Sequence, residues 1–452
     1  MKRLSYRNYM LVLLMVIYAF SSVDRLALGL VLQSIKSDLD LSDTRLGFLS
    51  GIAFSLFYAV MGIPIARWAD RGNRPLIIAL TTALWSISVA LMAVVRSFPQ
   101  LLLLRISVAV GEAGCVPSAL SMIADNFDRE SRPRAVSAYL QGGSISLVIG
   151  YFVAGWVNEY LGWRNMFLLL SAPACILVIL ALLTLREPRR AALRGPTVEK
   201  APADGGGEDA TEQPASFGEV ARSLWSNRSF RSILLFYSVG YFFNAGITQW
   251  HPAFFIRKYG ISTGELGTWM AATAGIGMVL GIYAGGELAS RYAATNEKLQ
   301  LRAMALSWCA LSVISAAIIV APNRYCAFAC LGLLNIVGTM ALGPLMAIVQ
   351  SLVPRRSRAT SIAIIYLFSN LVGMGLGPFT TGFLSDLIAP LVGADSLRDA
   401  MLCLSPGYVC AGLLLWLAAG SVARDLPDRI VATDGVPGEL SPRIGAPALT
   451  RS

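Results

Sequence analysis

The main pattern along the chain is a series of long apolar runs separated by short polar segments. A helix that crosses a bilayer needs about 20 mainly apolar residues, and these runs reach that length. They are too long for the alternating strands of about ten residues that build an outer-membrane barrel. The pattern predicts an all-α membrane protein with twelve spans, over residues 8–33, 46–66, 75–95, 100–124, 134–157, 165–185, 231–256, 264–289, 300–321, 325–352, 359–389 and 398–422.

A polar segment divides the twelve spans into two sets of six. Residues 187–215 are rich in Gly and Pro and lack aromatic side chains, which is typical of a disordered linker. Just after them, the apolar side chains of Phe217, Val220 and Leu224 share one helical face. This face predicts a short interfacial helix, with continued linker as the alternative. We therefore expect four regions: a six-helix bundle (1–186), a cytoplasmic linker with an interfacial helix (187–229), a second six-helix bundle (230–424) and a disordered cytoplasmic tail (425–452).

Composition and charge agree with a membrane protein. Hydrophobic residues make up 55% of the chain and charged residues 14%, with a mean hydropathy of +0.61, which excludes an ordinary soluble enzyme. The net charge is +10. If the N-terminus is cytoplasmic, 27 of the 37 Lys and Arg residues fall in cytoplasmic segments, eight in outer segments and two within spans. This bias predicts cytoplasmic termini, and it explains the basic balance without a nucleic-acid partner.

The sequence contains no motif that predicts a metal site or a nucleotide-binding site. The seven cysteines lie inside apolar runs without a C-x-x-C pair, as packing residues do. The single histidine, His251, excludes a site built from several histidines. No G-x-x-x-x-G-K-[ST] motif is present, so ATP is not expected to supply the energy. We therefore expect no metal and no cofactor.

Four charged residues lie within spans of the first half: Asp24 and Arg25 on span 1, and Arg105 and Glu112 on span 4. A charge at the bilayer centre costs at least ~2.5–3.5 kcal/mol, so each needs a partner or a wet cavity. Arg105 and Glu112 share a helix face, roughly 10 Å apart. Asp24 and Arg25 point about 100° apart, so we expect Asp24 to pair with Arg105, or Arg25 with Glu112.

These four residues suggest a site for protons and an anionic group. Competition between a proton, an arginine and a substrate for one carboxylate is a workable coupling device. We expect Glu112 to carry the proton and Arg105 to bind the anion, with Asp24 and Arg25 in support. The alternative is a static ion-pair network that fixes helix packing.

The second half has no charged residue at mid-membrane depth. Its candidate cavity residues are Asn244, His251 and Asn370, and a packing role is the alternative for His251. A charged wall opposite an apolar wall suits an amphipathic substrate. Glycines on spans 5 and 11, such as Gly155 and Gly382, predict close helix packing across the two halves, although ordinary packing within a half would use them equally well.

Basic loops follow the second, fourth, eighth and tenth spans, so the two halves repeat. Here the sequence resembles the major facilitator superfamily. Its signature after span 2, G-x-x-x-D-R-x-G-R-R/K, is matched by Asp70, Arg71 and Arg74, whereas both glycines and the last basic residue are absent. The resemblance implies a cytoplasmic gate in which Asp70 meets the positive end of the eleventh span near Thr360. Arg134, from the loop after span 4, is placed at the same gate.

Longer phrases narrow the resemblance. GIPIARWADRGNR after span 2, RISVAVGEAGCVPSALSMIADNF on span 4 and LGWRNMF before span 6 resemble the bacterial branch of the spinster-like family. This resemblance implies a monomeric, multi-pass secondary transporter of the bacterial inner membrane, working by alternating access. It implies that the partners are protons and a lipid-like anion, such as a lysophospholipid or sphingoid phosphate. It also implies that the protein is not an enzyme. A proton-coupled symporter of small organic anions and a polyspecific drug exporter stay open as alternatives.

Overall fold

The computed structural model describes residues 2–128, 130–187, 225–293, 296–353 and 358–425, and within these ranges it contains helices and no strands. The helices of the first half are α1 (Lys2–Leu39), α2 (Asp43–Ser50), α3 (Ile52–Arg71), α4 (Arg74–Leu91), η1 (Met92–Val94), α5 (Phe98–Ala113), α6 (Cys115–Asn126) and α7 (Arg132–Thr184). Those of the second half are α10 (Arg228–Thr248), α11 (His251–Tyr259), α12 (Thr263–Tyr292), α13 (Glu297–Val320), α14 (Arg324–Thr339), α15 (Leu342–Leu352), α16 (Arg358–Phe368), η3 (Ser369–Leu376), α17 (Gly377–Val392), η4 (Gly393–Asp395), α18 (Ser396–Leu404) and α19 (Gly407–Asp425).

All twelve predicted spans have helical counterparts. Nine helical stretches in the described residues are long and apolar enough to cross a membrane. Two of them, Arg132–Thr184 and Thr360–Val422, each contain two predicted spans. The first pair is separated at Gly162, whose φ of 79° turns the chain. The predicted seventh span corresponds to α10 and α11, outside those nine stretches. The predicted linker, most of the interfacial helix and the tail lie outside the described residues.

Five predicted spans are broken rather than continuous. Span 2 breaks at Gly51 and span 12 between α18 and α19; span 4 breaks at Gly114, span 10 between α14 and α15, and span 7 between α10 and α11. The breaks in spans 4, 10 and 7 are each followed by a proline in the first turn of the next helix, at Pro117, Pro344 and Pro252. Proline cannot donate a backbone hydrogen bond to the preceding turn, which favours an interruption there. The breaks in spans 4 and 10 occupy equivalent places in the two halves, as the internal repeat implies.

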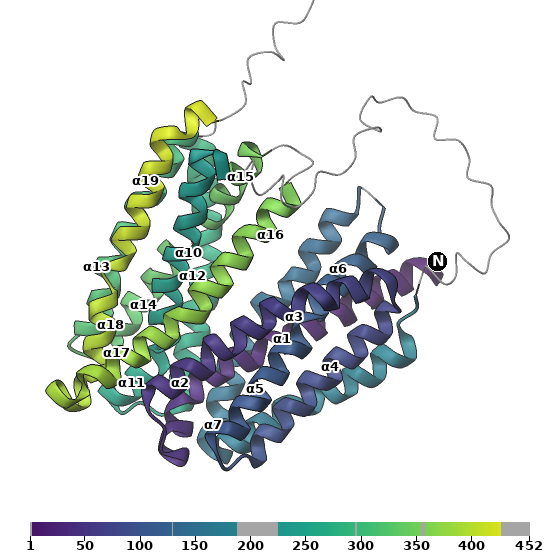
Figure 1. Cartoon of the computed structure of the whole chain (residues 1–452), viewed down its shortest axis with the longest axis horizontal. Coiled ribbons are helices and arrows are strands. Elements are labelled where there is room, and N and C mark those ends of the chain that lie inside the picture. The colour runs from purple at the N-terminus through teal and green to yellow at the C-terminus, as the bar shows by residue number, and fades with distance from the viewer. Residues whose placement is uncertain (1, 129, 188–224, 294–295, 354–357, 426–452) are drawn as a thin grey trace, which may run out of the picture.

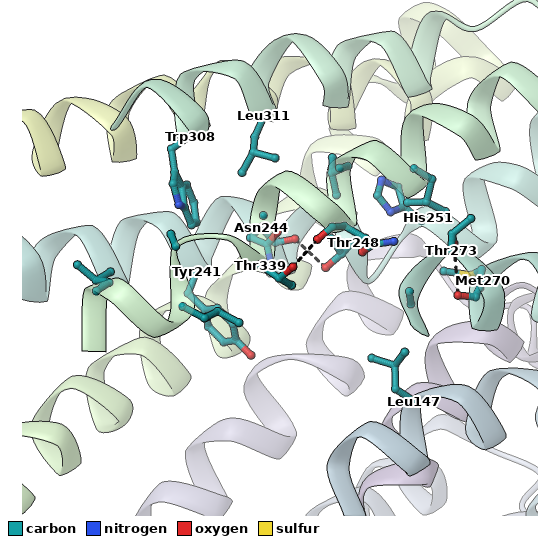
Figure 2. Close-up of a pocket in the computed structure, with 18 of the residues that line it drawn as sticks. Leu147, Tyr241, Asn244, Thr248, His251, Met270, Thr273, Trp308, Leu311 and Thr339 are labelled. Carbon is teal, nitrogen blue, oxygen red and sulfur yellow. Dashed lines mark hydrogen bonds between the residues drawn. The ribbon is translucent and has the colours of Figure 1, made fainter. Parts of the chain in front are cut away.

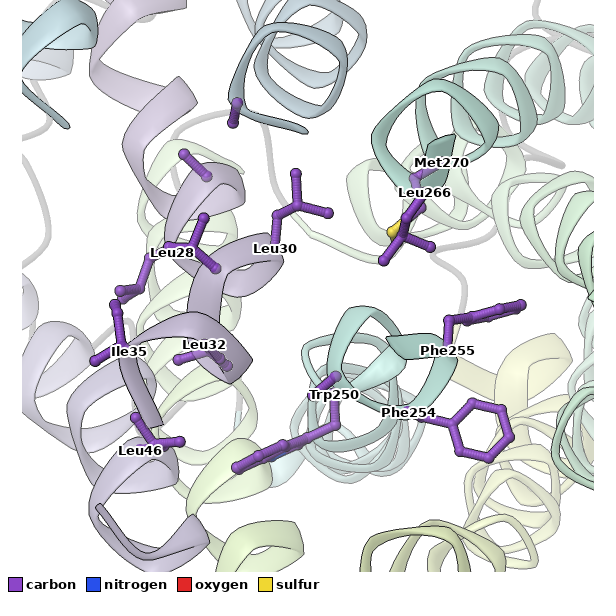
Figure 3. Packing of buried hydrophobic residues seen from close by; sticks show 14 of the residues in the cluster. Leu28, Leu30, Leu32, Ile35, Leu46, Trp250, Phe254, Phe255, Leu266 and Met270 are labelled. Carbon is purple, nitrogen blue, oxygen red and sulfur yellow. The ribbon is translucent and has the colours of Figure 1, made fainter. Parts of the chain in front are cut away.

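The helices form two bundles that meet at one end and diverge toward the other (Figure 1). We call the end near Arg74 and Thr184, where the linker leaves the first half, the linker end; the opposite end, near Asp43 and Arg257, is the distal end. At the distal end one buried core joins both halves, with Leu32 and Leu46 beside Trp250 (Figure 3). Toward the linker end each half has its own core.

Glycines allow the halves to approach closely at the distal end. A Cβ atom at Gly155 of α7 would lie 2.4 Å from the Thr263 carbonyl oxygen of α12, and one at Gly267 would lie 2.3 Å from the Tyr151 carbonyl oxygen. Gly382 of α17 meets the first half in the same way, 2.2 Å from the Asp43 carbonyl oxygen. The prediction of cross-half packing is confirmed at these positions. Other glycines of α7, such as Gly142 and Gly150, pack within the first half against α1.

Candidate functional site

The four charged residues predicted from the sequence form one cluster between α1 and α5, in which three side chains are buried and that of Arg25 is 25% exposed. Asp24 Oδ2 accepts a hydrogen bond of 2.8 Å from Arg105 Nη1, and both side chains are 3% exposed. Arg25 Nε lies 3.3 Å from Glu112 Oε2, and the Glu112 side chain is 2% exposed. The sequence suggested either pair, whereas the structure forms both at once. Each helix therefore contributes one acid and one base, and the cluster is neutral overall.

Phe54 of α3 packs its ring against both arginines of the cluster. Its ring centroid lies 4.5 Å from the guanidinium carbon of Arg105 and 5.3 Å from that of Arg25. An aromatic ring attracts cations through its quadrupole without supplying a hydrogen bond or a proton. Phe54 thus stabilises both arginines and leaves their donors free for carboxylates or a ligand. Sequence reasoning missed this residue, because nothing distinguishes it from other aromatics in an apolar run.

The four charged side chains form two ion pairs, but several of their polar atoms accept or donate no hydrogen bond among the described residues. Within the described part of the chain, buried atoms without a hydrogen-bond partner include Asp24 Oδ1, Arg105 Nε and both carboxylate oxygens of Glu112. Glu112 has Asp24, Arg25 and Arg105 as electrostatic neighbours. A buried carboxylate without hydrogen bonds is costly, and such a group accepts a proton or a donor readily. The geometry therefore leaves room for a proton at Glu112.

A cavity of about 470 Å³ lies mainly in the second half (Figure 2). Of the residues predicted for it, Asn244 and His251 line the cavity, while Asn370 on the π-helical segment η3 is not among its lining residues. The first half contributes Leu147 and Tyr151 of α7. The four charged residues do not line this cavity. The described residues that line it include no Asp, Glu, Lys or Arg; they are apolar and aromatic side chains with interspersed hydroxyls, amides and the imidazole of His251.

The predicted gate residues lie at the linker end, where Arg74 forms the most extensive contacts. Its side chain is fully buried; Nη1 donates to Asp125 Oδ2 at 2.6 Å and to Ser121 Oγ at 3.0 Å, and the guanidinium also pairs with Glu187. Arg71 and Arg134 are exposed. The side chain of Asp70 and residues 354–357, which precede the eleventh span, lie outside the described parts. The predicted contact of Asp70 with that span stays a prediction.

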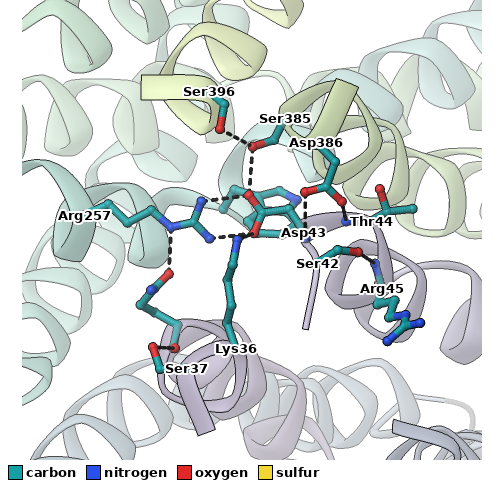
Figure 4. Close-up of polar contacts among 12 residues, drawn as sticks. Lys36, Ser37, Ser42, Asp43, Thr44, Arg45, Arg257, Ser385, Asp386 and Ser396 are labelled. Carbon is teal, nitrogen blue, oxygen red and sulfur yellow. Dashed lines mark hydrogen bonds and ion pairs between the residues drawn. The ribbon is translucent and has the colours of Figure 1, made fainter. Parts of the chain in front are cut away.

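A polar network at the distal end, which sequence reasoning missed, joins the two halves (Figure 4). The carboxylate of Asp43, at the start of α2, accepts two hydrogen bonds from Arg257 of α11, at 2.6 and 2.7 Å. Lys36 Nζ and Ser385 Oγ of α17 also donate to it, at 2.6 and 2.8 Å. Asp43 is 2% exposed, so these bonds are shielded from solvent. We call Asp43, Arg257, Lys36, Ser385 and Asp386 the distal clamp.

Asp386 completes the clamp by capping α2. Its two carboxylate oxygens accept hydrogen bonds from the backbone N–H groups of Asp43 and Thr44, at 3.1 and 2.7 Å. A carboxylate at a helix N-terminus satisfies donors that have no partner within the helix. The sequence carried one signal for this contact: Asp386 lies three residues inside the end of an otherwise apolar predicted span. Its partner in the other half could not be read from the sequence.

Comparison with known proteins identifies transporters whose similarity extends over most of this chain. The model of the Major Facilitator Superfamily matches residues 14–378. An MFS-type efflux pump of Mycolicibacterium smegmatis is 34% identical over 412 residues, covering 89% of this chain and 90% of that protein. A probable L-galactonate transporter of Escherichia coli is 25% identical over 378 residues, with 80% of each chain covered.

Among solved structures, the chain is similar to a bacterial homolog of the human lysosomal transporter Spinster, in an inward-facing and unoccupied conformation. The TM-score is 0.81 at 27% identity, and the match covers 94% of this chain and 99% of that one. The fold, the twelve spans and the family phrases thus agree, and the relatives are transporters, not enzymes. The chain belongs to the Major Facilitator Superfamily of multi-pass membrane transporters, within which it resembles the bacterial spinster-like branch.

Proposed function

We propose that this secondary transporter couples proton movement to the transport of an amphipathic, lipid-like anion such as a lysophospholipid or a sphingoid phosphate. It acts as a monomer in the bacterial inner membrane, with the linker end and both termini in the cytoplasm. The observation that carries the proposal is the cluster of Asp24, Arg25, Arg105 and Glu112, whose pairs are formed but whose hydrogen-bonding capacity is unfilled.

Proton binding at Glu112 links the two events. When Glu112 is ionised, it pairs with Arg25 at 3.3 Å. A proton on Glu112 neutralises this pair and leaves the Arg25 guanidinium without its counter-ion. An anionic group can then take the place of the carboxylate, because a cation that is three-quarters buried is unfavourable without a partner. Proton and anion therefore bind together, and deprotonation of Glu112 expels the anion by restoring the original pair.

Alternating access uses the distal clamp. Asp43 and Arg257 hold the halves together at the distal end, while each half keeps a separate core toward the linker end. This arrangement is consistent with an inward-facing state, and the similar solved structure carries that description. Opening of the clamp, with closure at Asp70, Arg71, Arg74 and Arg134, exposes the cavity on the opposite side. The two halves rock about the site between them.

Uptake into proteoliposomes tests the proposal. Purified protein is reconstituted, and a radiolabelled lysophospholipid is offered with an inward pH gradient, an outward gradient, or none. We expect one gradient direction to drive accumulation above the gradient-free level, and a protonophore to abolish it. Accumulation that ignores both gradient and protonophore contradicts proton coupling. Absence of any lysolipid flux, together with gradient-driven uptake of sugar acids, contradicts the lipid-like substrate.

Export of several compounds is the second candidate. It is favoured by one observation, the 34% identity to an efflux pump over nearly the whole chain. In that case the same cluster acts as an antiport site, and protons enter as cargo leaves. Overexpression then raises resistance to several structurally unrelated compounds. The small-organic-anion alternative is supported by the 25% identity to a probable L-galactonate transporter.

A further inference from the structure

The wall of the second-half cavity contains three buried polar groups that have no hydrogen-bond partner among the described residues. They are Tyr237 Oη, His251 Nε2 and Trp308 Nε1, from α10, α11 and α13. His251 is 1% exposed. A buried donor or acceptor left unsatisfied costs about 1–3 kcal/mol. Three such groups around one cavity point to a ligand that supplies their partners, because ordinary packing would have selected apolar side chains there.

The chemistry of these groups narrows the ligand. Trp308 Nε1 can only donate, and the Tyr237 hydroxyl can donate. Asn244 also lines the cavity; its Oδ1 already accepts a 3.2 Å hydrogen bond from Tyr408, which leaves its amide N–H groups as donors. The wall therefore offers mainly donors, and none of its described residues is a Lys or Arg that could balance a full negative charge. Uncharged oxygen acceptors fit this wall, whereas a phosphate or carboxylate does not.

The cavity also lies close to the charged cluster. Tyr241, on the same helix as Tyr237 and Asn244, lines the cavity and packs against Gly373 of η3. Two residues further along η3, Gly375 packs against Ser55, the neighbour of Phe54 in the charged cluster. A single amphipathic molecule can thus place its anionic group at the arginines and its uncharged oxygens in the second half. The aromatic rings of Phe236 and Trp308, whose centroids lie 4.7 Å apart, offer an apolar surface beside the donors.

We propose that Tyr237, His251 and Trp308 form a subsite for the uncharged oxygens of the cargo, such as the ester carbonyl and hydroxyl of a lysophospholipid. This subsite rests on the proposed lipid-like substrate and deepens it. The first half recognises the charge of the cargo, and the second half distinguishes among cargoes of equal charge. A site built to hydrogen-bond an oxygen discriminates strongly against an analogue that lacks it.

Paired lipids that differ in one oxygen test the subsite. An ester-linked lysophospholipid and its ether-linked analogue, equal in chain length and headgroup, compete for uptake into proteoliposomes of the full-length protein. The wild type is expected to prefer the ester by about tenfold, the effect of roughly 1.4 kcal/mol. Tyr237→Phe and Trp308→Phe, which remove one donor each and keep an aromatic ring, should each reduce that preference severalfold. Tyr283→Phe, at a 73% exposed position of α12, should leave it unchanged.

The outcomes separate the subsite from the transport function. Equal uptake of ester and ether by the wild type overturns the subsite, while lysolipid transport stands. An ester preference that survives both substitutions also overturns it, because the discrimination then arises elsewhere. Failure to transport either lipid contradicts the proposed function itself. Direct binding measured by a thermal shift of each variant distinguishes lost recognition from misfolding.

Discussion

At the residue scale, the central feature is a set of four charges, three of them buried and the fourth, Arg25, partly buried, held by two helices and one aromatic ring. Asp24 and Arg105 are both shielded from solvent, and Glu112 is shielded beside the partly exposed Arg25, so the partners in each pair depend on one another more strongly than surface pairs do. Asp24 and Arg105 form the better hydrogen-bonded pair, at 2.8 Å. Arg25 and Glu112 are joined at 3.3 Å without a hydrogen bond to the carboxylate. We therefore propose a mainly structural role for the first pair, in place of the anion binding expected for Arg105 from the sequence, and exchange of protons and anions at the second.

Removal of one partner from the structural pair should destabilise the protein. In Arg105→Ala the Asp24 carboxylate is left buried and unpaired, and breaking a buried pair in this way costs about 3–5 kcal/mol. The midpoint of thermal unfolding in detergent should fall accordingly. Adding Asp24→Asn should restore part of the loss, since the amide carries no charge. Arg324→Ala, which breaks an exposed pair with Glu265, should cost about 0–1 kcal/mol. Equal shifts for the two single variants would contradict a buried, interdependent pair.

Sequence reasoning identified these four residues because charge within an apolar run is costly and therefore conspicuous. It predicted the partners from helix geometry, but treated the two pairs as alternatives. It could not find Phe54, whose contribution depends on the approach of α3 to α1 and α5. The orphaned Tyr237 and Trp308 were missed for the same reason, because a lack of partners is visible only after folding.

At the element scale, glycines decide how closely the two halves approach. Gly155 of α7 and Gly267 of α12 face each other, and each would place a Cβ against backbone of the opposite half. Backbone atoms cannot move aside as a flexible side chain can. The contact therefore needs glycine at both positions.

A methyl group at this contact should push the helices apart. Gly267→Ala should destabilise the protein by about 1–3 kcal/mol, as overpacking does, because its Cβ would lie 2.3 Å from the Tyr151 carbonyl oxygen. Gly286→Ala, on the same helix but with open space around it, should be neutral or stabilising by up to about 1 kcal/mol, through helix propensity. Thermal unfolding of the two variants checks this. If the unfolding midpoints of both variants change equally, the contact between Gly155 and Gly267 does not hold the two halves together.

Helix existence was predictable from apolar length, whereas interruptions were not. The breaks at Gly114 and before Leu342 lie inside continuous apolar runs, and membrane helices tolerate proline often enough that Pro117 and Pro344 did not decide the matter. The eight-residue π-helical segment Ser369–Leu376 was likewise invisible from composition. Predicted spans therefore matched in number and order, but five of them consist of two helices each.

At the scale of the whole molecule, the distal clamp fixes which end is closed. Asp43 receives donors from its own half and from the other, and Asp386 caps α2 across the same boundary. The sequence predicted the two bundles and their relation by repeat. It could not predict this clamp, because Asp43 and Asp386 are 343 residues apart and only the fold brings them together.

Loss of the clamp should shift the population toward the state that is open at the distal end. Spin labels are placed at Arg96 and Asp395, one in each half, in a variant without the native cysteines. Arg257→Ala should then increase the population of longer distances between the two labels, measured by double electron–electron resonance. Arg324→Ala, which breaks a distal-end pair within one half, is the control and should leave the distribution unchanged. If Arg257→Ala shows the wild-type distribution, the clamp does not hold the closed end.

If the carboxylate of Glu112 couples protons to transport, removal of that carboxylate should abolish the coupling while the transport pathway remains. Glu112→Gln removes the titratable group and keeps its size, and Glu265→Gln is the matched control at a 35% exposed glutamate. Both are assayed in proteoliposomes for accumulation driven by a pH gradient and for exchange of labelled against unlabelled lysophospholipid. We predict that Glu112→Gln loses gradient-driven accumulation but retains exchange, whereas Glu265→Gln keeps both. Full gradient-driven accumulation by Glu112→Gln would show that Glu112 does not couple protons to transport.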